Sequence, residues 1–229
     1  ANAGGHGFYR VQYAPAMLRR MTKALSRIPP IERFNLVNDA LALTQAGAMS
    51  AAEFLDLTGR FRDETDRNVW TALTGSFAYL SRLIAEGVRP GIEAWVRHRL
   101  EPAVERLGWE RQPEETELTR QLRADLLRVL GTLGNDEETQ RRARSLYEGY
   151  RSDETAVDPN LLPALISILA ASGGEAEYDE FLQRFKSART PQEEQRYLYA
   201  LAAFRQPALI GRTLERTING EVRSQDAPF

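Results

Sequence analysis

The sequence has no cysteine and only two histidines, His6 and His98. Without cysteine, neither a disulfide framework nor a thiolate metal site can form, and we expect a protein of a reducing compartment, the cytoplasm. A hydrolytic zinc site needs about three protein ligands and a general base, commonly from a His-Glu-x-x-His helix. Neither histidine lies in such a motif, and no Gly-x-Ser-x-Gly elbow or phosphate-binding loop is present. We therefore expect no catalytic residue, no metal and no cofactor in this chain.

A charge of predominantly one sign is also missing. The 30 basic and 32 acidic residues leave a formal net charge of -2, which gives no attraction for nucleic acid or an anionic membrane surface. No apolar run approaches the roughly 18 residues of a membrane span. The densest basic cluster is Arg141-Arg142-Ala143-Arg144, and Glu137 and Glu138 lie about one turn before it. Ion pairing along a solvated helix face explains this cluster better than a phosphate site does. Nucleic acid and membranes are thus not expected as partners.

The first residues differ from the rest of the chain. Residues 8–13 alternate, with Tyr9, Val11 and Tyr13 on one side, and aromatic and β-branched residues of period two predict a strand. No second convincing strand follows. A single strand leaves its backbone groups without partners, so we expect its sheet to be supplied from outside this chain. We assign residues 1–14 to the final strand of a preceding β-sandwich domain.

From residue 15 onward the apolar periodicity is helical, and we assign residues 15–229 to one α-helical repeat domain that is truncated at its C-terminal end. Pro29-Pro30 is expected to close the first helix, and Ser50-Ala51-Ala52-Glu53 has the spacing of a capping box that opens a later one. The predicted helices cover residues 34–45, 50–61, 66–86, 89–107, 118–133, 136–150, 160–171, 175–187, 192–203 and 207–217. Trp70, Trp95 and Trp109 lie on or near apolar stripes and are expected in the core.

The second half resembles a weak repeat in which an apolar helix is followed by a more amphipathic one. The apolar helices end at Leu130-Gly131, Leu169-Ala170 and Leu201-Ala202. These spacings, about 39 and 32 residues, are typical of stacked helical pairs. We expect an all-α fold of antiparallel helix pairs, stacked as a curved solenoid of the HEAT or armadillo kind with a concave surface, after one short N-terminal strand. An irregular helical bundle is the alternative.

Several segments carry a family resemblance. Residues 2–13 resemble the Asn-x-x-Gly-(Tyr/Phe)-Tyr-Arg-Val-x-Tyr segment of aminopeptidase N-type zinc peptidases, and residues 33–43 resemble their Arg-x-x-Leu-(Leu/Ile)-(Asn/Asp)-Asp-Ala-Phe-x-Leu helix. Residues 64–70 are similar to the pattern Glu-x-(Asp/Glu)-Tyr-x-x-Trp, with Arg67 in place of the aromatic residue, and residues 222–226 resemble Ile-Arg-x-Gln-Asp. The four matches follow the family order from residue 2 to residue 226.

The resemblance implies the C-terminal helical domain of such an enzyme, without the catalytic domain that holds the zinc ion. In this family the helical domain closes over the zinc site, limits entry to peptides and often supplies a basic group for the far end of the substrate. The expected partners are the catalytic domain of the same polypeptide and the peptide substrate.

Arginine is the side chain best suited to hold a free peptide carboxylate. Arg82 and Arg205 lie near the C-terminal ends of predicted helices, and Tyr79 is one turn before Arg82. These three are the candidate peptide-binding residues, although an arginine there can also simply complement the helix dipole. Asp39 and Glu64 are interpreted as caps or internal hydrogen-bond partners. A second hypothesis is a stand-alone helical-repeat scaffold that binds a protein partner, for which an orphan strand would have little use.

Overall fold

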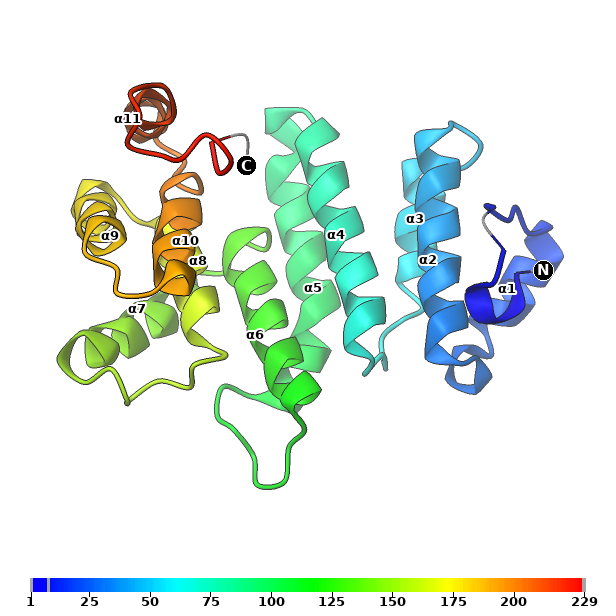
Figure 1. Cartoon of the computed structure of the whole chain (residues 1–229). Helices are drawn as coiled ribbons and strands as arrows, with labels where there is room; N and C mark the ends of the chain where they lie inside the picture. Colours follow the sequence, from blue (N-terminus) through cyan, green and yellow to red (C-terminus); the bar gives the residue numbers. More distant parts are fainter. Residues whose placement is uncertain (1, 8, 228–229) are drawn as a thin grey trace. The chain divides into compact units, whose positions relative to one another are not determined.

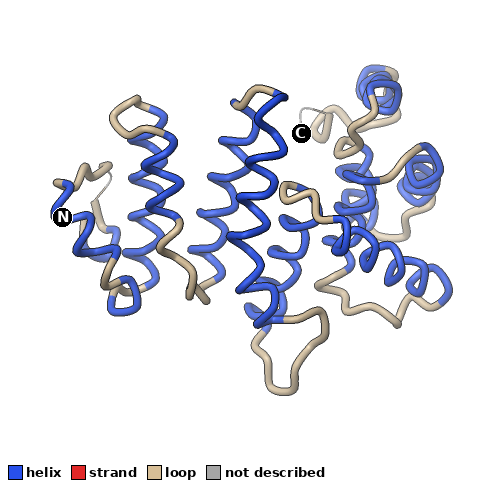
Figure 2. Tube along the Cα trace, turned by 180° about the vertical axis from the view of Figure 1, so that it is seen from behind, coloured by secondary structure: helices blue, strands red, loops and turns tan. Residues whose placement is uncertain are grey.

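The computed structural model describes residues 2–7 and 9–227, and all regular secondary structure among them is helical (Figures 1 and 2). The α-helices are α1 (Pro15–Thr22), α2 (Pro30–Gln45), α3 (Ala51–Thr58), α4 (Arg67–Leu83), α5 (Arg89–Leu107), α6 (Glu117–Thr132), α7 (Glu137–Ser152), α8 (Leu162–Ser172), α9 (Glu175–Lys186), α10 (Pro191–Leu201) and α11 (Pro207–Ile218). Short 3₁₀ helices occupy η1 (Ala3–Gly5), η2 (Leu25–Arg27) and η3 (Glu86–Val88). The all-α prediction is therefore confirmed. In the part of the chain described, no helix has both the length and the apolar character needed to cross a membrane.

The predicted N-terminal strand is not formed. Residue 8 lies outside the described residues, and residues 9–14 have no regular secondary structure. The alternating pattern is real, but a strand exists only when a neighbouring strand pairs with its backbone. The described residues offer no such neighbour, so these residues connect η1 to α1 without forming a ladder.

Several helix starts follow from local chemistry. Ser50 Oγ accepts a hydrogen bond from the N–H of Glu53 at 3.2 Å, while the Glu53 carboxylate accepts one from the N–H of Ser50 at 2.8 Å. This is the predicted capping box, and it begins α3. The prediction for Pro29-Pro30 was wrong in position: α1 already ends at Thr22, and Pro30 is the first residue of α2. Proline fits the first helical position because no N–H is needed there.

The chain divides into two compact units, residues 1–126 and 127–229. In the first unit, α2 packs against both α3 and α4, and α4 packs against α5 (Figure 1). Trp70 is 1% exposed, and the ring of Phe77 meets the ring of Trp95 edge-on at 4.8 Å between centroids. Trp70 lies in the core as predicted, whereas Trp95 and Trp109 are only half-buried.

In the second unit, the pairs α7–α8 and α9–α10 pack together, and α8 also contacts α10. The repeat positions Leu130, Leu169 and Leu201 are all buried and lie in the alternate helices α6, α8 and α10. Gly131 permits a close approach: a Cβ added there would lie 2.8 Å from Cγ1 of Ile168 in α8. Between the pairs lies an aromatic core, which contains Tyr147, Tyr178, Phe181, Tyr197 and Phe204.

Candidate functional site

Arg82 and Tyr79 lie together at the C-terminal end of α4 in the first unit. Three positions apart, they share one helix face. Arg82 is exposed and Tyr79 is 37% exposed. Within residues 2–7 and 9–227, Arg82 has no ion pair or hydrogen bond to another side chain. Leu83 and Val88 nearby are also exposed, at 66% and 58%. The end of α4 therefore carries an exposed guanidinium group without an ion-pair partner among the described residues, next to the exposed side chain of Leu83.

Arg205 has a different environment. Because α10 ends at Leu201, Arg205 lies in the turn before α11 rather than in the last turn of a helix. Its side chain is exposed, and Nη2 donates a hydrogen bond to the carbonyl oxygen of Thr132 at 2.8 Å. Thr132 is the last residue of α6, where carbonyl groups lack helical partners. Arg205 thus caps a helix end within the second unit, and part of its hydrogen-bonding capacity is already used.

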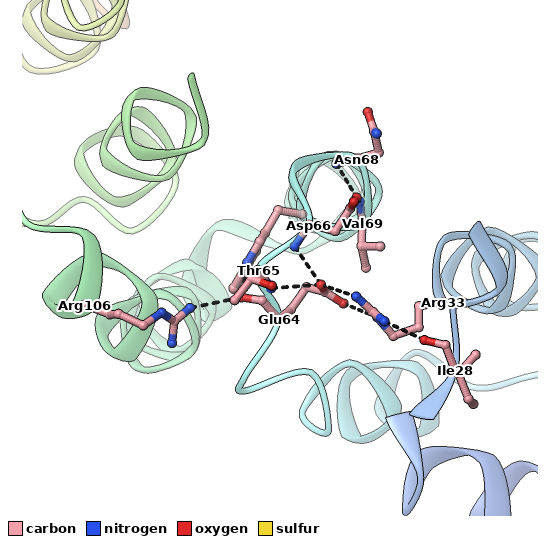
Figure 3. Close-up of polar contacts among 9 residues, drawn as sticks. Ile28, Arg33, Glu64, Thr65, Asp66, Asn68, Val69 and Arg106 are labelled. Atoms are coloured by element: carbon pink, nitrogen blue, oxygen red, sulfur yellow. Dashed lines mark hydrogen bonds and ion pairs between the residues drawn. The ribbon is translucent and has the colours of Figure 1, made fainter. Parts of the chain in front are cut away.

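The most elaborate polar centre is the pair Arg33–Glu64, which joins α2 to the turn before α4 (Figure 3). Arg33 Nε and Nη2 donate to the two carboxylate oxygens of Glu64 at 2.6 and 2.7 Å, and Arg33 Nη1 donates to the carbonyl of Ile28 at 2.6 Å. The Glu64 side chain is 1% exposed and that of Arg33 is 13% exposed. Two-pronged pairs of this kind are both strong and geometrically specific.

Backbone groups complete this centre. Glu64 Oε1 also accepts the N–H groups of Thr65 and Asp66, both at 2.8 Å. Burial alone would raise the pKa of Glu64, but the hydrogen bonds from Arg33 and from these two N–H groups together bring it below its ordinary value. The hydrogen bond to Glu64 likewise raises the pKa of Arg33. Glu64 is therefore an internal hydrogen-bond partner, as predicted, and it remains ionised.

The carbonyl of Glu64 is used as well. It accepts Nε1 of Trp70 at 3.0 Å and Nη2 of Arg106 from α5 at 3.0 Å (Figure 3). The Asp66 carboxylate caps α4 by accepting the N–H groups of Asn68 and Val69 at 2.9 and 3.1 Å. The sequence patterns mark the segments that contain these residues but do not predict the pairing, because nothing local links positions 33 and 64. The arrangement is a structural clamp, in which the charged groups of Arg33 and Glu64 are bound to each other and to backbone groups.

The remaining sequence candidates have structural explanations. His6 and His98 are both exposed. In the basic cluster, Arg141 pairs with Glu138 at 2.7 Å along α7, and Arg144 pairs with Glu177 of α9. Glu137 and Glu138 lie in the first turn of α7, and Glu193 and Glu194 in that of α10, where they match the helix dipole. Among the residues described, no group of three or more His, Asp or Glu side chains could hold a metal ion.

Comparison with known proteins agrees with this helical architecture. A model of the ERAP1-like C-terminal domain matches residues 1–229. Aminopeptidase M1-A of Oryza sativa subsp. japonica is 27% identical over 237 residues, which cover 100% of this chain and 27% of the relative. Aminopeptidase M1 of Arabidopsis thaliana is 28% identical, with the same coverages, and glutamyl aminopeptidase of Mus musculus is 27% identical over 91% of this chain and 22% of the relative. The chain spans about a quarter of the length of these relatives.

The described chain is all-helical, and the family model and the named relatives define its class as a C-terminal domain of aminopeptidases. The chain belongs to the ERAP1-like C-terminal domain family. This confirms the resemblance to the C-terminal domain of aminopeptidase N-type enzymes that the motifs had indicated.

Proposed function

We propose that this chain is the non-catalytic helical domain of a zinc-dependent aminopeptidase, where it covers the active site and helps to enclose and size peptide substrates. The single observation that carries the proposal is the match of the family model to the whole chain, residues 1–229. The named relatives are aminopeptidases, and the chain covers only about a quarter of their length. The partner is therefore the catalytic domain of the same polypeptide, which would hold the zinc ion.

Enclosure requires a concave surface, and the helix pairs α7–α8 and α9–α10 are the kind of unit that stacks into a curved, HEAT-like wall. Closing such a wall over a reaction centre excludes water and strengthens electrostatic contacts inside. A domain with this role needs no reactive group of its own. It needs a shaped surface and a few polar groups that hold the substrate.

Arg82 is the better of the two arginine candidates for the far carboxylate of a peptide. Its guanidinium is exposed and uncommitted, and Tyr79 on the same face offers aromatic surface and a hydroxyl group. Arg205 has part of its capacity bound to Thr132. A charge-assisted hydrogen bond to a carboxylate contributes about 1.5–3 kcal/mol, which is enough to bias binding towards substrates that reach it.

The test uses the complete enzyme that carries this domain. Arg82→Ala should raise the KM of peptides long enough to reach α4 about tenfold, while aminoacyl-arylamide substrates keep their kcat/KM. Arg20→Ala, another exposed arginine, is the matched control and should change neither. An equal fall in kcat/KM for short and long substrates, or no fall for either, would contradict the role of Arg82.

The domain assignment has its own test. The isolated chain should show no chelator-sensitive aminopeptidase activity and no stoichiometric zinc, and its deletion from the complete enzyme should alter substrate length preference. Zinc-dependent activity in the purified chain would contradict the proposal. The alternative is a stand-alone scaffold, and the N-terminal segment does not separate the two, because residues 9–14 have no regular secondary structure. The full-length family match favours the peptidase domain. The cytoplasmic location stays a prediction.

A further inference from the structure

A hollow of about 540 Å³ lies in the first unit, between α1 with the preceding residues 11–13 on one side and the α2–α3 pair on the other. Its wall includes the apolar side chains of Leu18, Leu36, Leu43, Met49 and Leu57. Sites for small ligands typically have volumes of about 300–1,000 Å³ and mostly apolar walls with a few polar groups. The hollow has the size and lining of such a site.

The helix that closes one side of this hollow has little other packing. None of the residues of α1 is buried, although Met17, Leu18 and Met21 give it apolar character. Pro15 and Leu18 of this helix line the hollow. An amphipathic helix normally buries its apolar face against a neighbouring element. In α1 only Leu18 of these three apolar side chains lines the hollow, where an apolar ligand could cover it.

One charged group is buried in the wall. Asp39 is 4% exposed, and its nearest counterion, Arg10, lies 3.7 Å away with a side chain that is 61% exposed. The other charged residues of the wall are exposed: Arg19, Glu53, Asp56 and Arg60. Arg60 lies 3.5 Å from Asp56, and Glu53 is bound to Ser50 in the capping box.

Exposed charges are screened by water and salt, whereas a buried charge is screened much less. Asp39 is therefore the one buried charged group of the wall, and its partners are the exposed Arg10 at 3.7 Å and the backbone N–H of Val11. Tyr13, also in the wall, adds a polar hydroxyl group. Burial and the nearby carboxylates of Asp39 and Glu32 raise the pKa of Tyr13, so this hydroxyl stays neutral.

We propose that this hollow binds a small organic cation with an apolar body, such as an alkylammonium, with the ammonium group on Asp39 and the alkyl part against Leu18, Leu43 and Met49. The ammonium group would give the buried Asp39 a second counterion inside the hollow, in addition to the exposed Arg10, and the alkyl part would bury apolar surface on both sides of the hollow. The proposal is independent of the proposed peptidase role, because the hollow is lined by α1, α2 and α3 and includes neither Arg82 nor Tyr79 of α4.

Isoamylamine and isoamyl alcohol, titrated into the chain at pH 7 by NMR or calorimetry, test the charge requirement. The amine should bind at a single saturable site about tenfold more tightly than the alcohol, and Asp39→Asn should abolish this preference. No saturable binding of the amine, equal affinities for the two probes, or an unchanged preference in a folded Asp39→Asn protein would each overturn the proposal.

A second pair of variants locates the site even if Asp39→Asn fails to fold. Ala51 and Ala52 are both exposed neighbours in α3, but only Ala52 lines the hollow. Ala52→Trp should fill the space and weaken amine binding at least about tenfold, and Ala51→Trp should leave it unchanged. Equal affinities in the two variants would mean that the amine binds elsewhere, which would overturn the assignment.

Discussion

The guanidinium of Arg33 and the carboxylate of Glu64 form two parallel hydrogen bonds of 2.6 and 2.7 Å, although the residues are 31 positions apart in the sequence. The pair ties α2 to the turn that begins α4. Each partner comes from a different segment of family resemblance, residues 33–43 and 64–70. The clamp therefore gives a physical reason why both segments carry a recognisable pattern: each supplies one half of a buried ion pair.

Removing Arg33 should destabilise the fold strongly. In Arg33→Ala, Glu64 would stay buried without its counterion, and breaking a buried pair in this way costs about 3–5 kcal/mol. Chemical denaturation should show this loss in the free energy of unfolding. Arg141→Ala is the control: Arg141 and Glu138 form an ion pair whose side chains are 71% and 73% exposed, and its loss should cost under about 1 kcal/mol. Similar losses in the two variants would contradict the structural role of the clamp.

The same pair should make stability depend on pH. The folded-state pKa of Glu64 is below its ordinary value of 4.5. Glu64 therefore contributes stability that is fully present above pH 4.5 and is lost as the pH falls through the folded-state value. Unfolding free energies at pH 7 and pH 3 should differ less in Glu64→Gln than in the parent chain. An unchanged difference would assign the acid sensitivity to other carboxylates.

Substitution by alanine should have opposite effects on stability at Gly131 and at Gly149. Both glycines lie in helices. A Cβ added at Gly131 would lie 2.8 Å from the side chain of Ile168, whereas a Cβ added at Gly149 would have no atom of a neighbouring element within 4 Å. Gly131→Ala should destabilise the chain by about 1–3 kcal/mol through overpacking. Gly149→Ala should stabilise it by about 0.5–1 kcal/mol, because alanine restricts the unfolded chain more and favours helix.

Thermal or chemical unfolding of both glycine variants measures these effects. Combining Gly131→Ala with Ile168→Ala should cost less than the sum of the two single changes, because the second change removes the atoms that the new Cβ meets. Strict additivity would show that Gly131 is not in close contact with α8.

Arg205 should behave as a structural residue. Arg205→Ala removes the hydrogen bond to the Thr132 carbonyl at the end of α6 and should lower the free energy of unfolding by about 1 kcal/mol. Arg82→Ala removes no such contact and should change stability by less than about 0.5 kcal/mol. The two variants compared in one denaturant series would distinguish a helix cap from a free surface group. A stability loss for Arg82→Ala equal to that for Arg205→Ala would contradict this division.

The capping box offers a test of a feature that the sequence already indicated. Ser50→Ala should destabilise α3 by about 1 kcal/mol, because the N–H of Glu53 loses its acceptor. Ser224→Ala, an exposed serine outside any helix, should stay within about 0.5 kcal/mol of the parent chain. Unfolding curves that coincide for the two variants would show that the box adds nothing to stability.

The sequence by itself determined the helical class, the approximate extents of most helices, the capping box at Ser50 and the burial of Trp70. These features depend on residues within a few turns of one another, so periodicity and local hydrogen-bonding chemistry are sufficient to predict them. The strand expected at residues 8–13 is not confirmed in the described residues, since a strand requires a paired neighbour and its sheet was expected from outside this chain.

Only the tertiary structure decided which polar residues are committed and which are available. Arg82 and Arg205 are equivalent in the sequence, yet one remains uncommitted on α4 and the other caps α6. The Arg33–Glu64 clamp and the hollow beside Asp39 were likewise outside the reach of sequence analysis. Each depends on segments that meet only when the chain folds, and the burial of a charge depends on everything that packs around it.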